Sequence, residues 1–559
     1  MSESTRLVVV GGVAGGMSCA ARARRLDESA EIIVLEAGPY VSFANCGLPY
    51  FVSGEITKES ALLVQTPESL KASLNLDVRP NNRVTAIDPN TKTVTVASAE
   101  GEYTLGYDAL VLSPGTDAFR PPLPGLDSPR VHTLRTVDDA RTLHALVAGG
   151  ARRAVVLGAG FIGLEAAEGL NHQGLRTSLV ELAAHVLPPL ESEMAWWVER
   201  ELERIGIDLH VGVGAERIEH LADHDVVHLA DGTTIDADLI VLSVGVRPAT
   251  AFVEAAGVAT ERGSIVVDAH GRTNLPGIWA VGDATMSVDA ATGATRPVWL
   301  AGPANREGRL IADDIFRPGT ARPLAAAGST AIVRAGGLTA ALTGANRSSL
   351  DAAGLAYETL HAHPNQHAGY FPGAKAVHLM VHFNPTDGTL YGAQAVGDDG
   401  VDKRIDVIAT AMRGGLKVDD LIDLDLAYAP QYGSAKDPIN MLGYAGENVL
   451  NGTLKLWHAS DWDREAAGAL LLDVRRRDEW EKVHVEGSLQ IPHTELRARL
   501  DEVRDAAAGR PVRVFCQSGV RSAIAHRILT AAGFDSASLS GGMLTIRSSG
   551  VPVVTQEGN

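Results

Sequence analysis

The 559-residue sequence predicts an α/β protein of several domains, because two of its segments repeat the order strand, glycine turn, helix, strand. Residues 6–36 run from RLVVV through glycines into a helical pattern and then into EIIVLEA. Residues 152–181 repeat the order with RRAVVLGAGFIGLEAAEGL and RTSLVEL. A chain of this length is also too long for a single hydrophobic core.

The first segment is typical of a βαβ unit that binds a dinucleotide. Glycines let a pyrophosphate approach the helix N-terminus, and an acid after the second strand binds the ribose hydroxyls. Val13 replaces the middle glycine of G-x-G-x-x-G, so the prediction depends on the strand, turn, helix and acid together. The alternative is that the glycines serve only tight packing. The candidate binding residues are Gly11, Gly12, Ala14, Gly15 and Glu36.

The second segment keeps all three glycines in register and ends its second strand at Glu181. A carboxylate there repels a 2′-phosphate and binds a free ribose diol, and no arginine follows in ELAAHVL. We therefore predict NADH as the preferred nucleotide, with NADPH possible. The candidate NAD-binding residues are Gly158, Gly160, Phe161, Ile162, Gly163, Glu181 and Gly245.

Further apolar strands connect these units. Residues 107–116 and 237–248 each end in a glycine turn, and TNLPGIWAVGDA ends a strand at Asp283. Cofactors bind at the carboxyl edge of open α/β sheets, although an aspartate there could also be a turn or helix cap. Two βαβ units imply two cofactors, a tightly held FAD and an exchangeable nicotinamide. We assign 1–120 with 271–325, including Asp283 and Ala301, to the FAD domain, and 121–270 to the NAD(H) domain.

Residues 326–450 read as a third, mixed α/β domain with the strands STAIVRA, AVHLMVHFN and YGAQAVG and the helical DKRIDVIATAMRGG. Its histidines are concentrated between 361 and 382, but their spacing fits no compact ligand set. We therefore expect no metal site, and favour surface or interface positions for His361, His363, His367, His378 and His382.

Residues 451–465 are predicted to be a linker and 466–559 a compact C-terminal domain. One strand of this domain ends at Asp473, and another runs into Cys516, followed by a loop and a helix. Backbone N–H groups and a helix N-terminus stabilise a thiolate or persulfide at such a position, and we place the positive charge of Arg521 in that loop. The alternative is an inert core cysteine.

Bulk properties exclude other classes of protein. A net charge of −19 argues against nucleic acid as a partner, and no apolar run is long enough to span a membrane. The N-terminus enters a strand by residue 7, so we expect no signal peptide. Three separated cysteines, Cys19, Cys46 and Cys516, favour a cytoplasmic protein that uses thiols chemically, with Cys19 only packing the first helix.

Four stretches resemble one family. SFANCGLPY (42–50), LAGPANREGR (300–309), HAGYFPGA (367–374) and DLAYAPQYGSAKDPIN (425–440) resemble the single-cysteine branch of the pyridine nucleotide–disulfide reductases, which comprises coenzyme A disulfide reductases and NAD(P)H-dependent persulfide reductases. CQSGVRS (516–522) resembles the C-x-x-G-x-R-S motif of rhodanese domains. The resemblance implies two Rossmann-like domains, an α/β dimerisation domain (326–450) and a rhodanese domain (466–559).

The resemblance also assigns roles to residues. It implies that Cys46 pairs with the thiol of coenzyme A, and that Tyr370 and Tyr428 reach the site from the partner subunit of a homodimer. A lysine that contacts coenzyme A in some relatives falls near Leu74, with Lys71 out of register. The implied coenzyme A-binding residues are Ser18, Arg22, Arg25, Ser42, Asn45, Asn305 and Lys436.

The resemblance therefore implies an FAD-dependent NAD(P)H reductase of coenzyme A persulfide, coenzyme A disulfide or polysulfide. Cys46, Tyr370 and Tyr428 would act in reduction, and Cys516 with Arg521 would carry sulfane sulfur. Two alternatives are an NADH oxidase or peroxidase that uses a sulfenic acid at Cys46, and a sulfur-carrier or redox-sensing module that binds a partner protein.

Overall fold

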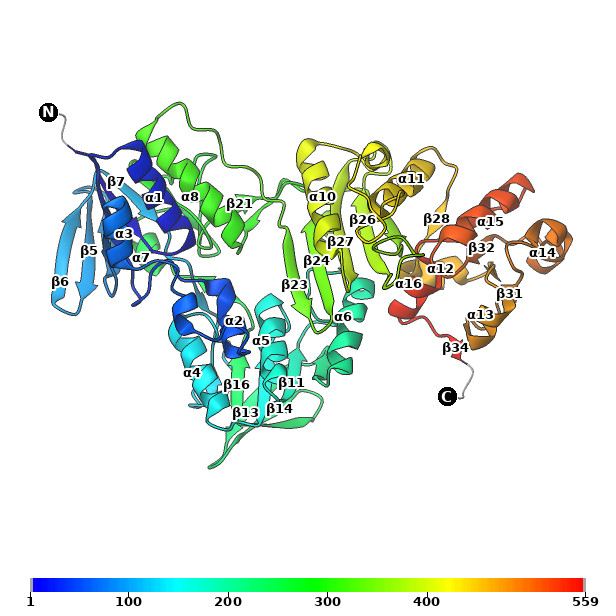
Figure 1. The fold of residues 1–559 in the computed structure, drawn as a ribbon, viewed down its shortest axis with the longest axis horizontal. Coiled ribbons are helices and arrows are strands. Elements are labelled where there is room, and N and C mark those ends of the chain that lie inside the picture. The colour runs from blue at the N-terminus through cyan, green and yellow to red at the C-terminus, as the bar shows by residue number, and fades with distance from the viewer. Residues whose placement is uncertain (1–3, 556–559) are drawn as a thin grey trace. The chain divides into compact units, whose positions relative to one another are not determined.

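The computed structural model describes residues 4–555, and the chain divides into two compact units (Figure 1). The first unit runs to Ala184 and resumes at Gly206–Ser329. The second contains His185–Ile205 and continues from Thr330. Each unit has its own sheets and cores.

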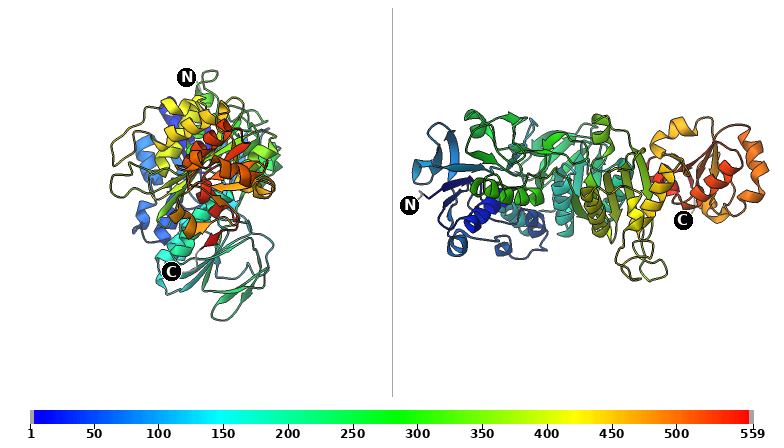
Figure 2. Two further views of the ribbon diagram at one scale, coloured as in Figure 1. Left: turned by 90° about the vertical axis from the view of Figure 1, so that its right-hand side faces the viewer. Right: turned by 90° about the horizontal axis from the view of Figure 1, so that it is seen from above.

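The first sheet of unit 1 has the order β20-β7-β1-β2-β3, and all its strand pairs are parallel. Its helices α1 (Ala14–Leu26) and α8 (Ala301–Phe316) lie side by side (Figures 1 and 2). They pack closely because Gly308 has no side chain: a Cβ there would lie 2.2 Å from the Gly15 carbonyl oxygen. The strands are β1 (Arg6–Val10), β2 (Glu31–Leu35), β3 (Asp77–Arg79), β7 (Ala109–Leu112) and β20 (Ile278–Ala280).

The second sheet of unit 1 has the order β12-β11-β10-β16-β9 and is also parallel. Both predicted βαβ units are therefore present, each with its helix between paired parallel strands. The elements are β9 (Val131–His132), α4 (Val137–Ala148), β10 (Arg153–Leu157), α5 (Phe161–His172), β11 (Arg176–Glu181), β12 (Asp208–Val211) and β16 (Leu239–Leu242).

Smaller elements complete unit 1. Two antiparallel three-stranded sheets are inserted between strands of the parallel sheets: β4-β5-β6 comes between β3 and β7 in sequence, and β13-β14-β15 between β12 and β16. Their strands are β4 (Arg83–Asp88), β5 (Thr93–Ser98), β6 (Gly101–Gly106), β13 (Ala215–His220), β14 (Asp225–Leu229) and β15 (Thr234–Ala237). Between β2 and β4 lie a 3₁₀ turn, η1 (Asn45–Gly47), and helices α2 (Leu48–Val52) and α3 (Pro67–Leu74).

Unit 2 contains an antiparallel sheet with the order β23-β24-β27-β26-β25. Helix α6 (Ser192–Arg204) belongs to this unit, although we predicted it inside the NAD(H) domain, 121–270. Glu201 accepts a hydrogen bond of 2.6 Å from Gly337 N, which ties α6 to this sheet. The other elements are β23 (Ala331–Ala335), β24 (Leu338–Gly344), β25 (Glu358–Ala362), β26 (Val377–Phe383), β27 (Leu390–Gly397), α10 (Val401–Gly414) and α11 (Pro438–Leu450).

A parallel sheet with the order β28-β33-β32-β29-β31 forms the C-terminal domain of unit 2. Its first strand, β28 (Leu456–Trp457), lies within the 451–465 segment that we predict to be a linker, and it pairs with β33. The sheet thus starts before residue 466, because Trp457 is buried at its edge. The other elements are β29 (Leu470–Asp473), β31 (Leu489–Gln490), α14 (Leu500–Ala507), β32 (Val512–Phe515), α15 (Val520–Ala531), β33 (Ser536–Leu539) and α16 (Gly542–Ser548).

The histidine-rich segment lies in the interior of unit 2 and not on its surface. His361, His367, His378 and His382 are all buried. His378 stacks on Trp197 of α6 with a centroid distance of 3.7 Å. Within residues 4–555, no group of histidine, cysteine and acidic side chains could hold a metal ion, and no helix is long and apolar enough to cross a membrane.

Candidate functional site

Both βαβ units open with a glycine in the left-handed region. Gly11 has φ +99° and Gly158 has φ +98°. A Cβ on Gly11 would lie 2.0 Å from the Ser113 carbonyl oxygen, and one on Gly158 would lie 2.3 Å from that of Ser243. A side chain fits neither position, so both require glycine. The matching φ angles and matching contacts show that the two turns follow the same backbone path.

A carboxylate closes each turn in the same way. Glu36 Oε2 accepts from Gly12 N at 2.7 Å, and Glu181 Oε2 accepts from Ala159 N at 2.7 Å. Their second oxygens accept from Gly38 N and Ala183 N, both at 2.8 Å. These bonds hold the acids beside the glycine turns, and each oxygen keeps a lone pair for a ribose hydroxyl.

The third glycine of each turn packs against the first. A Cβ on Gly16 would lie 2.0 Å from the Gly11 carbonyl oxygen, and one on Gly163 would lie 1.9 Å from that of Gly158. Gly16 is therefore the counterpart of Gly163, and the spacing of the second unit would have identified it. Gly15, one of the candidate binding residues, faces Val281 and the close approach of α8.

The middle position leaves room for a ligand. A Cβ on Gly160 would meet nothing within 4 Å, although Gly160 directly precedes α5. Ala14 opens α1, Phe161 and Ile162 open α5, and Ala301 opens α8. A helix N-terminus and a fixed carboxylate at each turn fit the pyrophosphate and ribose of a dinucleotide, and the second turn has open space at Gly160.

Two further predicted residues follow strands. Asp283 comes just after β20, at the carboxyl end of the first sheet, and its Oδ2 accepts from Arg135 Nη2 at 3.2 Å. Gly245 follows β16 with φ +105°, and its carbonyl oxygen accepts from Phe119 N at 2.9 Å. Both therefore occupy the sheet edge at which nucleotides bind in open α/β folds.

Cys46 lies in η1 and is solvent-exposed. The turn is fixed by bonds from Ala44 N to Leu62 O (2.7 Å) and from Gly47 N to Ala44 O (2.8 Å). Partial desolvation of the thiol, together with the negative charges of Glu165 and Asp283, raises the pKa of Cys46. Glu165 belongs to α5 and Asp283 follows β20, so the thiol is influenced by elements of both nucleotide turns.

Sequence reasoning missed the pair Tyr50 and Glu165. Tyr50 OH donates to Glu165 Oε1 at 2.9 Å, which links the segment of Cys46 to the helix of the second nucleotide turn. Glu165 lies on α5 just beyond the residues predicted to bind the nucleotide. Tyr50 is the last residue of SFANCGLPY, and no spacing rule pairs it with Glu165.

The structure brings together some of the predicted coenzyme A residues. Ser18 Oγ donates to Asn305 Oδ1 at 2.5 Å, across α1 and α8. Ser42, in the left-handed region with φ +46°, and Asn45 flank Cys46. Lys436 lies in unit 2, with Nζ 5.9 Å from the centroid of the Tyr444 ring.

The two predicted arginines on α1 differ. Arg22 forms an ion pair of 2.6 Å with Asp313 of α8, so its charge is already neutralised. Arg25 is exposed and donates only to its own helix, at Ala21 O. Lys71 donates to Asn75 Oδ1 at 2.8 Å. Of these cations, Arg25 is the one best placed to meet a phosphate.

Tyr370 and Tyr428 form a pair in unit 2. Their hydroxyl oxygens lie 3.1 Å apart, and the hydrogen bond between them raises the pKa of Tyr370. Tyr370 is 77% exposed and Tyr428 48%. Asn440 Nδ2 donates to the carbonyls of Leu421, Ile422 and Leu424, which come just before the segment that contains Tyr428.

Cys516 follows β32 directly and is 1% exposed. Gly519 turns the loop with φ +95°, and α15 begins at Val520. Arg521 therefore belongs to the first turn of α15 and not to the loop. Its guanidinium binds Glu479 with bonds of 2.6 and 2.8 Å; this pair raises the pKa of Arg521, and the Cys516 sulfur acts in the same direction.

Comparison with known proteins agrees with this geometry. Residues 5–297 match the pyridine nucleotide-disulphide oxidoreductase family, residues 332–437 its dimerisation domain, and residues 455–548 the rhodanese-like domain. The chain is 34% identical over 456 residues to coenzyme A disulfide reductase of Staphylococcus haemolyticus, covering 79% of this chain and 100% of that protein.

Solved structures extend the similarity to the C-terminal domain. Reduced Bacillus anthracis CoADR-RHD matches with a TM-score of 0.95 and 40% identity over 98% of both chains. The NAD-dependent persulfide reductase of A. fulgidus matches with 0.90 and 35% over 97% of this chain and all of that one. A water-forming NADH oxidase of Lactobacillus brevis matches with 0.77 and 25%, over 80% of this chain and all of that one. The chain belongs to the pyridine nucleotide-disulphide oxidoreductase family and carries a dimerisation domain and a C-terminal rhodanese-like domain.

Proposed function

We propose that this protein is an FAD-dependent NAD(P)H reductase of coenzyme A persulfide and coenzyme A disulfide, with a fused sulfur carrier. The observation that carries the proposal is the position of Cys46, an exposed thiol influenced by Glu165 from one nucleotide turn and Asp283 from the other. Cys19, by contrast, is fully buried, which raises the pKa of its thiol to about 12. The similarity to coenzyme A disulfide reductase and to a persulfide reductase supports this choice of substrates.

The first turn, with Gly11 and Glu36, would hold FAD, and the second, with Gly158 and Glu181, would hold NADH. Together the two cofactors would supply two electrons to sulfur at Cys46. The Cys46 thiolate attacks the inner sulfur of coenzyme A persulfide, the S–S bond breaks, and hydrosulfide leaves with the electron pair. The resulting mixed disulfide takes up two electrons and a proton, which returns the Cys46 thiolate and free coenzyme A. A second protein cysteine is unnecessary because the substrate brings the partner sulfur.

We assign Ser18, Arg25, Ser42, Asn45, Asn305 and Lys436 to coenzyme A, with Arg22 held by Asp313 as a weaker candidate. Tyr370 and Tyr428 would donate a proton or hydrogen bond to the leaving sulfur from the partner subunit of a homodimer. Both tyrosines are exposed, so this hydrogen-bonded pair of hydroxyls can meet a second chain. Three unpaired cysteines also suit a cytoplasmic enzyme.

Glu181 makes NADH the expected donor. Its carboxylate is fixed beside the second turn, where it would bind a ribose diol and repel a 2′-phosphate. Steady-state turnover with both nucleotides tests this. A lower KM for NADPH than for NADH would contradict it.

Anaerobic stopped-flow separates the reductase from an oxidase. NADH-reduced enzyme is mixed in turn with coenzyme A persulfide, coenzyme A disulfide and O₂, and flavin reoxidation is followed. We expect the sulfur compounds to reoxidise the flavin fastest. Fast reoxidation by O₂ with inert sulfur compounds would instead indicate an oxidase, the activity of the similar Lactobacillus brevis protein.

A further inference from the structure

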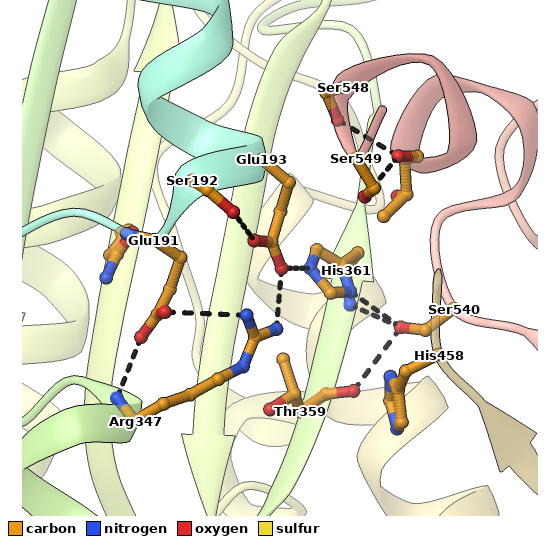
Figure 3. Close-up of polar contacts among 12 residues, drawn as sticks. Glu191, Ser192, Glu193, Arg347, Thr359, His361, His458, Ser540, Ser548 and Ser549 are labelled. Carbon is orange, nitrogen blue, oxygen red and sulfur yellow. Dashed lines mark hydrogen bonds and ion pairs between the residues drawn. The ribbon is translucent and has the colours of Figure 1, made fainter. Parts of the chain in front are cut away.

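The sheet of the dimerisation domain contacts the C-terminal domain through a small buried seam (Figure 3). His361 N donates to Ser540 Oγ at 2.9 Å, and His361 Nδ1 lies 2.9 Å from the same oxygen. His361 belongs to β25, and Ser540 directly follows β33. Both residues are buried, so this contact is shielded from water. We name His361, Ser540 and the supporting Glu193 the His361–Ser540 seam.

The protons of the seam can be assigned by counting. Burial lowers the pKa of His361, so its ring is neutral and carries one N–H. Nε2 lies 3.1 Å from Glu193 Oε1, and an ionised carboxylate only accepts, so the N–H is at Nε2. Nδ1 is then an acceptor, and it takes the hydroxyl proton of Ser540. The longer contact of Ser540 Oγ with Thr359 O, 3.3 Å, is the weaker alternative.

Glu193 is anchored from the other side. Arg347 Nη2 lies 2.6 Å from Glu193 Oε1, the same oxygen that His361 faces. Burial alone would raise the pKa of Glu193, but the hydrogen bond of His361 and the charge of Arg347 hold it well below its usual range. Figure 3 shows Glu193 between Arg347 and His361. Arg347 therefore holds the Glu193 carboxylate in place, and Glu193 in turn orients the His361 ring.

The two glycines after Ser540 connect the seam to the Cys516 loop. A Cβ on Gly541 would lie 2.8 Å from both His361 Cβ and His363 Nε2. A Cβ on Gly542 would lie 2.4 Å from the Cys516 carbonyl oxygen. This dipeptide, with φ +73° and +65°, thus touches the dimerisation domain on one side and the cysteine loop on the other.

The same segment bonds the loop directly. Met543 N donates to Cys516 O at 2.8 Å, and Leu544 N donates to Gln517 O at 3.1 Å. These N–H groups belong to the first turn of α16, which begins immediately after the seam. A shift of Ser540 would move α16 and, with it, the two N–H groups that hold the Cys516 loop in its path.

We propose that Ser540 and His361 are positioning residues for sulfur transfer at Cys516, so that the dimerisation domain completes the sulfur-carrier site. The inference rests on the proposed function, in which Cys516 carries sulfane sulfur. The Cys516 thiolate attacks the sulfane sulfur of thiosulfate, the S–S bond breaks, and sulfite leaves with the electron pair. Cyanide then attacks the terminal sulfur of the Cys516 persulfide, thiocyanate leaves, and the thiolate is restored.

The test uses the full-length holoenzyme with Ser540→Ala and His361→Phe. We expect either change to lower kcat for thiosulfate–cyanide transfer roughly tenfold with KM for thiosulfate nearly unchanged, because a misplaced loop slows the attack more than it weakens binding. Reduction of coenzyme A persulfide at Cys46 should stay within about twofold of the wild type, since it does not use this loop. Ser549→Ala is the matched control, because Ser549 Oγ donates to Thr545 O near the end of α16, away from Ser540.

Three outcomes count against the inference. Wild-type kcat in both seam variants would overturn it. An equal loss in Ser549→Ala would show that any weakening near α16 suffices, and would also overturn it. If the wild-type enzyme reduces coenzyme A persulfide but transfers no sulfur from thiosulfate to cyanide, Cys516 is not a sulfur carrier, and the inference is wrong while the reductase function stands. His361→Phe keeps the test decisive if Ser540→Ala does not fold.

Discussion

Cys46 and Cys516 lie in opposite surroundings. Cys46 is exposed in a short turn, where partial desolvation and then the carboxylates of Glu165 and Asp283 raise the pKa of its thiol. Cys516 is buried at a strand end, with Arg521 beside it and α16 bonded to its carbonyl. An open turn suits a substrate as large as coenzyme A, whereas a closed loop suits a small sulfur donor. In the proposed function, Cys46 changes oxidation state and Cys516 only carries a group, and the two surroundings match these two tasks.

The largest expected effect is a double dissociation between the cysteines. Cys46→Ser should lower reduction of coenzyme A persulfide by on the order of 10³-fold or more while thiosulfate–cyanide transfer persists. Cys516→Ser should do the reverse. The two assays are run on the same preparations, with the flavin spectrum as the measure of cofactor retention.

The comparison fails if the losses are shared. Should Cys516→Ser also abolish reduction of free coenzyme A persulfide, the cysteines would act in one obligatory sequence. Cys19→Ser serves as the control for a thiol that is buried in the core of the first sheet.

Loss of the hydroxyl of Tyr370 or Tyr428 should have a smaller effect than loss of a cysteine, and only on reduction at Cys46. Their hydroxyls are 3.1 Å apart, and a proton donor to the leaving sulfur contributes about 10²-fold in many enzymes. Tyr370→Phe and Tyr428→Phe should each lower kcat for reduction at Cys46 toward this factor and leave transfer at Cys516 unchanged.

Tyr432→Phe is the matched control, since Tyr432 is similarly exposed at 71% on the same segment. Equal losses in all three variants would indicate a loosened segment and not a proton donor. An unchanged kcat in Tyr370→Phe and Tyr428→Phe would remove both tyrosines from the mechanism.

Replacing Arg521 should have a smaller effect still, and only on sulfur transfer at Cys516. Its two bonds to Glu479 fix the guanidinium beside Cys516, and lysine cannot keep both bonds. Arg521→Lys should lower thiosulfate–cyanide transfer by about tenfold, with KM for thiosulfate rising as the anion is held less well. Arg527→Lys, on the same helix, is the control. A loss of persulfide reduction in Arg521→Lys would contradict the separation of the sites.

The sequence predicted those parts of the molecule that depend on local pattern. Apolar runs and glycine spacing gave both βαβ units, and the acids Glu36 and Glu181 lie where the spacing placed them. With Val13 at the middle position, the same spacing puts the third glycine of the first turn at Gly16, which was not among the candidate binding residues. A Cβ on Gly16 would clash with the Gly11 carbonyl oxygen, as one on Gly163 would with that of Gly158. Local pattern also placed Cys516 at a strand end.

Contacts between distant residues were beyond the same reasoning. Nothing in the sequence joins α6 to the third domain, yet Glu193 and Glu201 bind residues more than a hundred positions away. The buried histidines looked like surface or interface residues because a polar side chain gives no local sign of its partner. His361 is buried by Ser540, 179 residues further on. The predicted 451–465 linker also contains a strand, because two residues, Leu456 and Trp457, are enough to extend the sheet by pairing with β33.

The smallest expected effect concerns the charge near Cys46. Partial desolvation raises the pKa of its thiol, and the carboxylates of Glu165 and Asp283 raise it further by repelling the thiolate. Glu165→Gln removes one of these charges and keeps an oxygen to accept from Tyr50 OH. The pKa should therefore fall, and more thiolate should be present at neutral pH.

The pH dependence of inactivation by iodoacetamide measures this directly in oxidised holoenzyme. Its midpoint should move to lower pH in Glu165→Gln, and the rate below the midpoint should rise. Glu168→Gln, one turn further along α5, should leave the midpoint unchanged. A midpoint that moves upward in Glu165→Gln would mean that the carboxylate holds Tyr50 and the turn in place more than it repels the thiolate. The open surroundings of Cys46 would then depend on Glu165 for their shape, as those of Cys516 depend on α16.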